Sequence, residues 1–194
     1  MSTDIDRQWT SRIRRSVVAK LPPDKLLPDT QPAYVASWIY VFGVTTMAAL
    51  AVVIATGCIL AIDGPQWWHS SSLGHLINSM HLWGKFSMAA WRGGRSLTWV
   101  TGGVTFMASI LAGFTGYVSQ TNFDSQWIST QAKDGINSTG GGAFFNVLNL
   151  GQMLMWHIVL LPLVAVILTG LHVVMVRVKG VVPPFEDAKA EVSA

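Results

Sequence analysis

Three long stretches without any Asp, Glu, Lys or Arg dominate the pattern of apolar and polar positions. They cover residues 33–62, 96–118 and 151–176. A helix of about 20 apolar residues crosses the hydrocarbon core of a bilayer. Each stretch exceeds that length and therefore predicts a membrane-spanning helix. The chain is 51% hydrophobic and 12% charged, about half the charged fraction of a soluble domain. This composition indicates an integral membrane protein.

A fourth candidate helix, 73–91, is weaker because it is shorter than the other three and contains Lys85. Charge placement favours a fourth crossing. With four crossings, both termini and the Arg92–Arg95 loop share one side, which leaves Lys133 as the only basic residue in a loop on the other side. We therefore predict an all-α, four-helix membrane bundle over 32–182, with an abnormally short second helix and both termini cytoplasmic.

The flanking segments are polar and basic. Residues 1–31 contain six Lys or Arg residues and three prolines, with Trp9, Ile13 and Val17 recurring every fourth position. This spacing predicts a basic segment lying on the cytoplasmic membrane surface, although a solvated tail is equally consistent with it. No cleavable signal pattern is present, and 183–194 reads as a cytoplasmic tail. The sequence pI of about 9.2 reflects membrane orientation rather than nucleic-acid binding.

The outward loop between the third and fourth long helices, 117–150, shows no clear helix of its own. Loops of this length tend to be functional or mobile. We expect either amphipathic pieces that cover a lipid-facing or quinone-facing pocket, or a flexible connector.

Two histidines lie inside the last apolar stretch. His157 and His172 are fifteen residues apart, which is about 22 Å along a helix with an excess of about 60° over four turns. The imidazoles therefore lie on nearly one face, one towards each side of the membrane. Ionisable side chains in membrane helices are usually functional, and neutral imidazole is a common axial ligand of haem iron. This spacing favours two haems, one near each side.

Two glycine pairs repeat a similar spacing. Gly43 and Gly57 are fourteen residues apart in the first helix, as are Gly102 and Gly116 in the third. Each pair marks one helix face at two depths. A glycine admits a flat ring or a neighbouring backbone at close range, and tight helix packing is the alternative explanation.

Together these residues resemble the amino-terminal, haem-binding half of cytochrome b, in its split bacterial form. The resemblance rests on the two glycine pairs, the sequence Ala-Gly-Phe-Thr-Gly-Tyr at 112–117, the two histidines, and motifs following His81 and Asn122. It covers roughly 32–182. In the family, four helices hold two b haems, each between a histidine of the second helix and one of the fourth.

The resemblance implies an electron-transfer subunit of a quinol–cytochrome c oxidoreductase complex in the bacterial inner membrane. The implied partners are quinol, iron–sulfur and cytochrome c-type subunits, and a second copy in a homodimeric complex. The carboxyl-terminal half with its quinol-site motif is absent, so a separate chain would supply it. The family's Pro-Trp-Gly is Ser119-Gln120-Thr121 here, which leaves quinol-site details open. No residue is assigned a catalytic role.

Basic residues near the haem propionates are also implied. Arg92, Arg95 and Arg177 are the candidates, and membrane orientation alone is an alternative reason for their placement.

The second helix carries one family-type ligand where two are expected. Fourteen residues before and after His81 stand Trp67 and Arg95, neither of which is a ligand. His75, six residues away and about 120° around the helix, and His69 are interpreted as interfacial polar residues. We hypothesise that about fourteen residues and one ligand have been lost from this helix.

His81, His157 and His172 then remain as ligands for one or two haems. His81 could face either partner, with a slight preference for His172, and electron transfer would be impaired. Alternatives are a degenerate non-redox membrane scaffold, or the di-haem cytochrome subunit of a membrane dehydrogenase or hydrogenase.

Overall fold

The computed structural model describes residues 9–63 and 72–185. Within these ranges the protein is helical and contains no strand, which confirms the predicted all-α membrane bundle. The elements are α1 (Trp9–Lys20), α2 (Pro23–Leu26), η2 (Ala33–Ala36), α3 (Trp38–Asp63), α4 (Ser72–Ser87), α5 (Ser96–Val118), α6 (Phe123–Ser138), η3 (Gly141–Ala143), α7 (Leu150–Met155), η4 (Trp156–Leu160) and α8 (Leu161–Lys179).

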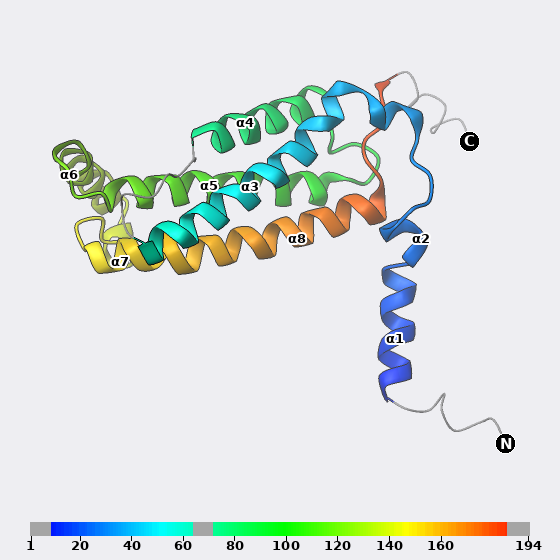
Figure 1. Cartoon of the computed structure of the whole chain (residues 1–194), viewed down its shortest axis with the longest axis horizontal. Helices are drawn as coiled ribbons and strands as arrows, with labels where there is room; N and C mark the ends of the chain where they lie inside the picture. The colour runs from blue at the N-terminus through cyan, green and yellow to red at the C-terminus, as the bar shows by residue number, and fades with distance from the viewer. Residues whose placement is uncertain (1–8, 64–71, 186–194) are drawn as a thin grey trace.

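The elongated body of the molecule is made of α3, α4, α5 and the continuous run from α7 to α8 (Figure 1). Helix α5 packs against α8 on one side and against α4 on the other, and α4 also packs against α3. Since α5 and α8 run in opposite directions, the start of α5 lies beside the end of α8 (Figure 1). Helix α5 is therefore the element that meets side chains from both α4 and α8.

Three runs, Trp38–Ile62, Ser96–Val118 and Leu150–Lys179, are long and apolar enough to cross a membrane. Large apolar side chains on their outer surfaces are exposed, such as Val44 and Ile167, as expected for helices that contact lipid. Helix α4 has 16 residues and rises about 24 Å, less than the roughly 30 Å hydrocarbon core. A fourth complete crossing stays a prediction.

Helix α4 ends at Ser87, and the predicted end at residue 91 was wrong. Ala89 has a φ of 48°, Ala90 N donates to Lys85 O at 3.0 Å, and Ala89 N donates to Phe86 O at 2.9 Å. This pair of bonds is the Schellman arrangement, in which a left-handed residue ends a helix. The usual signal is glycine, and here alanine occupies the position, so the sequence concealed the stop.

The connection between α5 and α7 contains a helix that the hydropathy pattern did not predict. Helix α6 covers Phe123–Ser138 and lies at one end of the bundle (Figure 1). The Asn122 side chain caps it by accepting a hydrogen bond from Ser125 N at 2.8 Å. Ser125 and Ser129 are buried. The capping residue and the absence of proline from 123–138 were the available signals.

The end of the bundle where α8 finishes is closed by the segment after α8. The Tyr40 hydroxyl donates to Val182 O at 2.6 Å, Arg95 Nε donates to Gly180 O at 3.1 Å, and the Arg92 guanidinium donates to Pro183 O. Helix α1 extends away from this end at a steep angle to the bundle axis (Figure 1), and its Trp9, Ile13 and Val17 are exposed.

Candidate functional site

His172 of α8 lies against the first two turns of α5. Its Nδ1 is 2.9 Å from the carbonyl oxygen of Thr98 and 3.3 Å from Thr101 Oγ1. A Cβ at Gly102 would lie 2.9 Å from His172 Cε1, closer than real Cβ contacts come. The imidazole therefore occupies space that only a glycine at position 102 leaves open.

His157 repeats this arrangement nearer the other end of α5. Its Nδ1 is 2.8 Å from the carbonyl oxygen of Ala112, and a Cβ at Gly116 would lie 2.8 Å from its Nε2. Ala112 precedes Gly116 by four residues, as Thr98 precedes Gly102. The two contacts are thus equivalent sites on α5, fourteen residues or about 21 Å apart.

A π-helical turn reconciles this spacing with the fifteen residues between the histidines. The turn covers Trp156–Leu160, and a single π turn inserts one extra residue into a helix. Fifteen residues therefore span the distance and rotation that fourteen cover in a regular α-helix. The sequence predicts that the two histidine side chains are rotated by about 60° from one another on a regular helix. This prediction is wrong because of the π turn.

The hydrogen bonds set the tautomer of both imidazoles. A carbonyl oxygen can only accept, so in the neutral ring Nδ1 carries the proton and Nε2 keeps its lone pair. Metal-binding histidines are commonly held in this way, with the second nitrogen donating to a carbonyl and the first directed at the metal. His157 and His172 therefore have the tautomer that haem iron requires.

His81 of α4 faces α3 and approaches His172. A Cβ at Gly43 would lie 3.3 Å from His81 Cε1, and its buried Nδ1 has no hydrogen-bond partner among the described residues. His81 and His172 lie close enough to interact electrostatically, and Lys85 interacts with both. The structure thus brings His81 to the level of His172 rather than to that of His157.

This donor set fits a haem at the His81–His172 level. Two neutral imidazoles, from α4 and α8, reach the same level of the bundle. The buried Nδ1 of His81 has no partner within the described part of the chain, and each ring lies against a glycine. A glycine lets each ring lie directly against the neighbouring backbone. Haem iron takes such nitrogen ligands.

The remaining predicted site residues are one glycine, Gly57, and three arginines, Arg92, Arg95 and Arg177. Gly57 lies half-buried on α3, fourteen residues after Gly43. Arg92 and Arg95 donate to backbone carbonyls of the segment after α8, and Arg92 also stacks 4.3 Å from the centroid of the Phe185 ring. Arg177 is exposed in the last turn of α8. The structure therefore gives Arg92 and Arg95 a role in closing the end of the bundle where α8 finishes.

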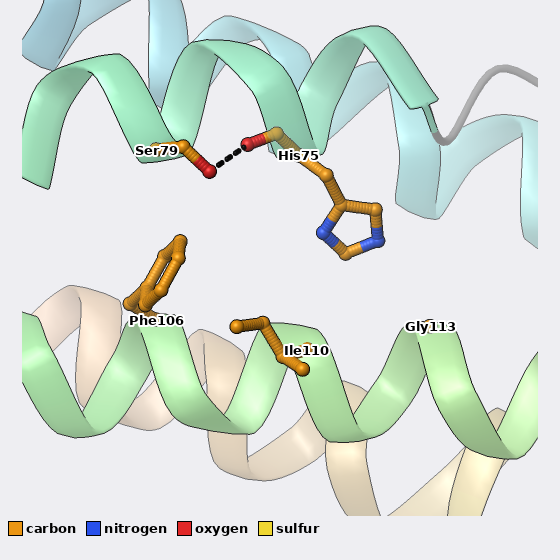
Figure 2. A pocket seen from close by; sticks show the side chains of 5 residues that line it. All are labelled: His75, Ser79, Phe106, Ile110 and Gly113. Carbon is orange, nitrogen blue, oxygen red and sulfur yellow. Dashed lines mark hydrogen bonds between the residues drawn. The ribbon is translucent and has the colours of Figure 1, made fainter.

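A fourth histidine lies inside the bundle. His75 of α4, interpreted above as an interfacial residue, points at α5 (Figure 2), and a Cβ at Gly113 would lie 2.9 Å from its Nε2. The available signal was Gly113 itself, the first glycine of the 112–117 motif. His69 and Trp67 lie outside the described residues.

Comparisons with known proteins agree with the predicted family. The family described as Cytochrome b(N-terminal)/b6/petB matches residues 76–194. A protein named cytochrome b6 from Heliomicrobium gestii is 24% identical over 189 residues, covering 79% of this chain and 89% of that protein. The cytochrome b subunit of a cytochrome bc complex from Chlorobaculum thiosulfatiphilum is 29% identical over 126 residues, covering 59% of this chain and 29% of that subunit.

Proposed function

Because this chain belongs to the Cytochrome b(N-terminal)/b6/petB family, we propose that it carries electrons across a membrane as the b-type haem subunit of a quinol-oxidising complex. The observation that carries this proposal is the repeated site on α5. His157 and His172 bond to carbonyls fourteen residues apart, and each ring lies against a glycine four residues further on.

The residues of this chain would bind, orient and enclose the group. His172 and His81 would hold haem b at the inner level through their ring nitrogens, and His157 would do so at the outer level. The carbonyls of Thr98 and Ala112 keep two of the rings in the required tautomer. Bound haem iron supplies one-electron redox chemistry.

The separation of the two levels suits a transmembrane path. Fourteen residues of α5 rise about 21 Å, which is most of the roughly 30 Å hydrocarbon core. Two haems at these levels would divide the crossing into short steps. We therefore assign the His81–His172 level to the inner leaflet and the His157 level to the outer leaflet, with both termini cytoplasmic.

The proposed assembly includes further chains. This chain spans about 29% of the Chlorobaculum thiosulfatiphilum subunit and 89% of the Heliomicrobium gestii cytochrome b6. We propose that a separate chain supplies the carboxyl-terminal half, with iron–sulfur and cytochrome c-type subunits in a homodimeric complex of the bacterial inner membrane. The exposed apolar side of α1 would lie on its cytoplasmic surface.

A degenerate scaffold that binds no haem is the second candidate function. It is favoured by the 16-residue length of α4 and by the single histidine that α4 offers at the family's spacing. A third case lies between a working electron-transfer subunit and a scaffold without haem. In it, the second helix has lost about fourteen residues and one ligand, and electron transfer is impaired. Sequencing the encoding DNA, or an intact mass of the native chain, tests that loss directly.

Reduction by quinol tests the proposed function. In membranes that contain the full chain and its partners, adding a quinol should produce the α band of a reduced b-type cytochrome. His172→Ala should remove the part of this band that belongs to the inner level, while Ile167→Ala, an exposed position on the same helix, should retain it. A band of unchanged size in the His172→Ala membranes would exclude His172 as a ligand, and no band in wild-type membranes would favour the scaffold.

A further inference from the structure

His75 occupies a defined position inside the bundle. Its ring points from α4 towards α5, and it lines a cavity of about 230 Å³ between these helices (Figure 2). The other lining residues are Ser79, Phe106, Ile110 and Gly113. The Nε2 of His75 is the atom nearest to the Cβ position of Gly113, at 2.9 Å. A nitrogen that can bind a metal is thus directed at the surface of α5.

The His157 ring reaches the adjacent part of the same surface. Gly113 and Gly116 are three residues apart on α5, which is about 4.5 Å along the axis and about 60° around it. His157 Nε2 lies 2.8 Å from the Cβ position of Gly116. Imidazoles from α4 and η4 therefore arrive at neighbouring glycines near the outer end of α5.

The direction of His75 follows from its place on α4. It precedes His81 by six residues, so the two side chains differ by about 120° around the helix. This difference sends His81 to Gly43 of α3 and His75 to Gly113 of α5. Side chains of one helix tilt alike towards its amino end, so the His75 ring lies further outward than the His81 ring by the rise of about 9 Å.

Polar contacts hold this turn of α4 in place. Asn78 Nδ2 donates to Ser109 Oγ of α5 at 3.1 Å, and Ser79 Oγ donates to the carbonyl oxygen of His75 at 2.8 Å (Figure 2). A side-chain bond between two membrane helices fixes their register. The Asn78–Ser109 bond, one turn after His75, thereby constrains which part of α5 His75 faces.

We propose that His75 is the second imidazole of the outer haem level and pairs there with His157. This inference rests on the proposed function and completes it: α4 would supply ligands six residues apart, directed at different neighbouring helices, in place of ligands fourteen residues apart. His75 stands immediately before the family match, which begins at residue 76.

The experiment counts haems and their ligands in the full chain purified from haem-replete membranes. The wild-type chain should contain about two haems, both low-spin with two imidazoles. His75→Ala should lower the haem-to-chain ratio to about one, or leave the outer haem high-spin, with the inner low-spin electron paramagnetic resonance signal unchanged. Added imidazole should restore the low-spin outer signal.

Matched variants separate ligation from packing. Ile110→Val alters the same cavity without removing a ring nitrogen and should keep both signals. His75→Phe keeps a ring of similar shape and should lose the outer signal as His75→Ala does. The retained inner signal reports that each variant is folded.

Four results would overturn the inference. Two low-spin haems in His75→Ala would exclude His75, and so would loss of the outer signal in His69→Ala with full retention in His75→Ala. A wild-type chain with one haem that His75→Ala leaves unaltered would overturn the pairing and leave the proposed function standing. A wild-type chain without haem would overturn both.

Discussion

His157 and His172 occupy equivalent positions on α5, although fifteen residues rather than fourteen separate them in the chain. Each ring bonds through Nδ1 to a carbonyl oxygen of α5, at 2.8 Å for Ala112 and 2.9 Å for Thr98. The π turn at Trp156–Leu160 absorbs the additional residue. The register between α5 and α8 thus depends on one local distortion beside His157.

Removing a residue from the π turn should preserve both sites. Deletion of Val159, which is 52% exposed, leaves fourteen residues between the histidines and allows a regular α-helix. We expect near wild-type haem content by pyridine haemochrome. Inserting one alanine after Val166 should instead rotate the two halves of the run by about 100° and remove about half of the haem. Equal haem content in both variants would show that the register is not set there.

Replacing a glycine of α5 by alanine should destabilise the protein on the face that contacts the histidines and should be harmless on the open face. A Cβ at Gly116 or Gly102 meets a histidine ring, whereas a Cβ at Gly103 has open space around it. Gly116→Ala and Gly102→Ala should each lower stability by about 1–3 kcal/mol through overpacking, measured by thermal unfolding in detergent. Gly103→Ala is the control and should be neutral or slightly stabilising because alanine favours helix. Similar losses at all three positions would argue against the placement of the rings.

Glycine at the end of α4 should stabilise the protein. Ala89 has a φ of 48°, a conformation that costs a residue with a Cβ roughly 1–2 kcal/mol. Ala89→Gly should raise the free energy of unfolding by up to about 1 kcal/mol after the entropy cost of glycine. Ala90→Gly makes the same change at a neighbour without a positive φ and should give no gain. A lower unfolding midpoint for Ala89→Gly would be inconsistent with the left-handed turn.

Loss of the Arg92 side chain should release the segment after α8. Its guanidinium donates to Pro183 O and stacks on Phe185, and a hydrogen bond from a charged group contributes about 1.5–3 kcal/mol. Arg92→Ala should speed hydrogen–deuterium exchange around residues 180–185, whereas Arg177→Ala should not. A shift in haem midpoint potential without faster exchange would instead assign Arg92 to a haem propionate.

Apolar run length was enough to predict α3, α5 and the α7–α8 run, because a charge-free stretch of more than about 20 residues has few alternatives to a membrane helix. Capping and backbone strain were harder to foresee. The stop of α4 depends on a left-handed alanine, and α6 depends on Asn122 and two buried serines rather than on apolar periodicity. Neither feature produces a strong hydropathy signal.

For the histidines too, part of the arrangement was predictable from the sequence and part depends on local backbone geometry. The shared face of His157 and His172 was predictable from regular helix geometry, but the π turn that aligns them was not. His75 was interpreted as an interfacial residue because it lies about 120° from His81 around α4. In the structure this rotation is what directs it to Gly113 of α5 while His81 faces Gly43 of α3.

The ratio of haem to protein in the purified full chain is the decisive measurement, because imidazoles at two levels of α5 are proposed to hold haem. Pyridine haemochrome should give about two b haems per chain, with about one in His157→Ala and about one in His172→Ala. A folded wild-type chain with no haem, or one whose ratio neither substitution lowers, would show that these histidines are not haem ligands.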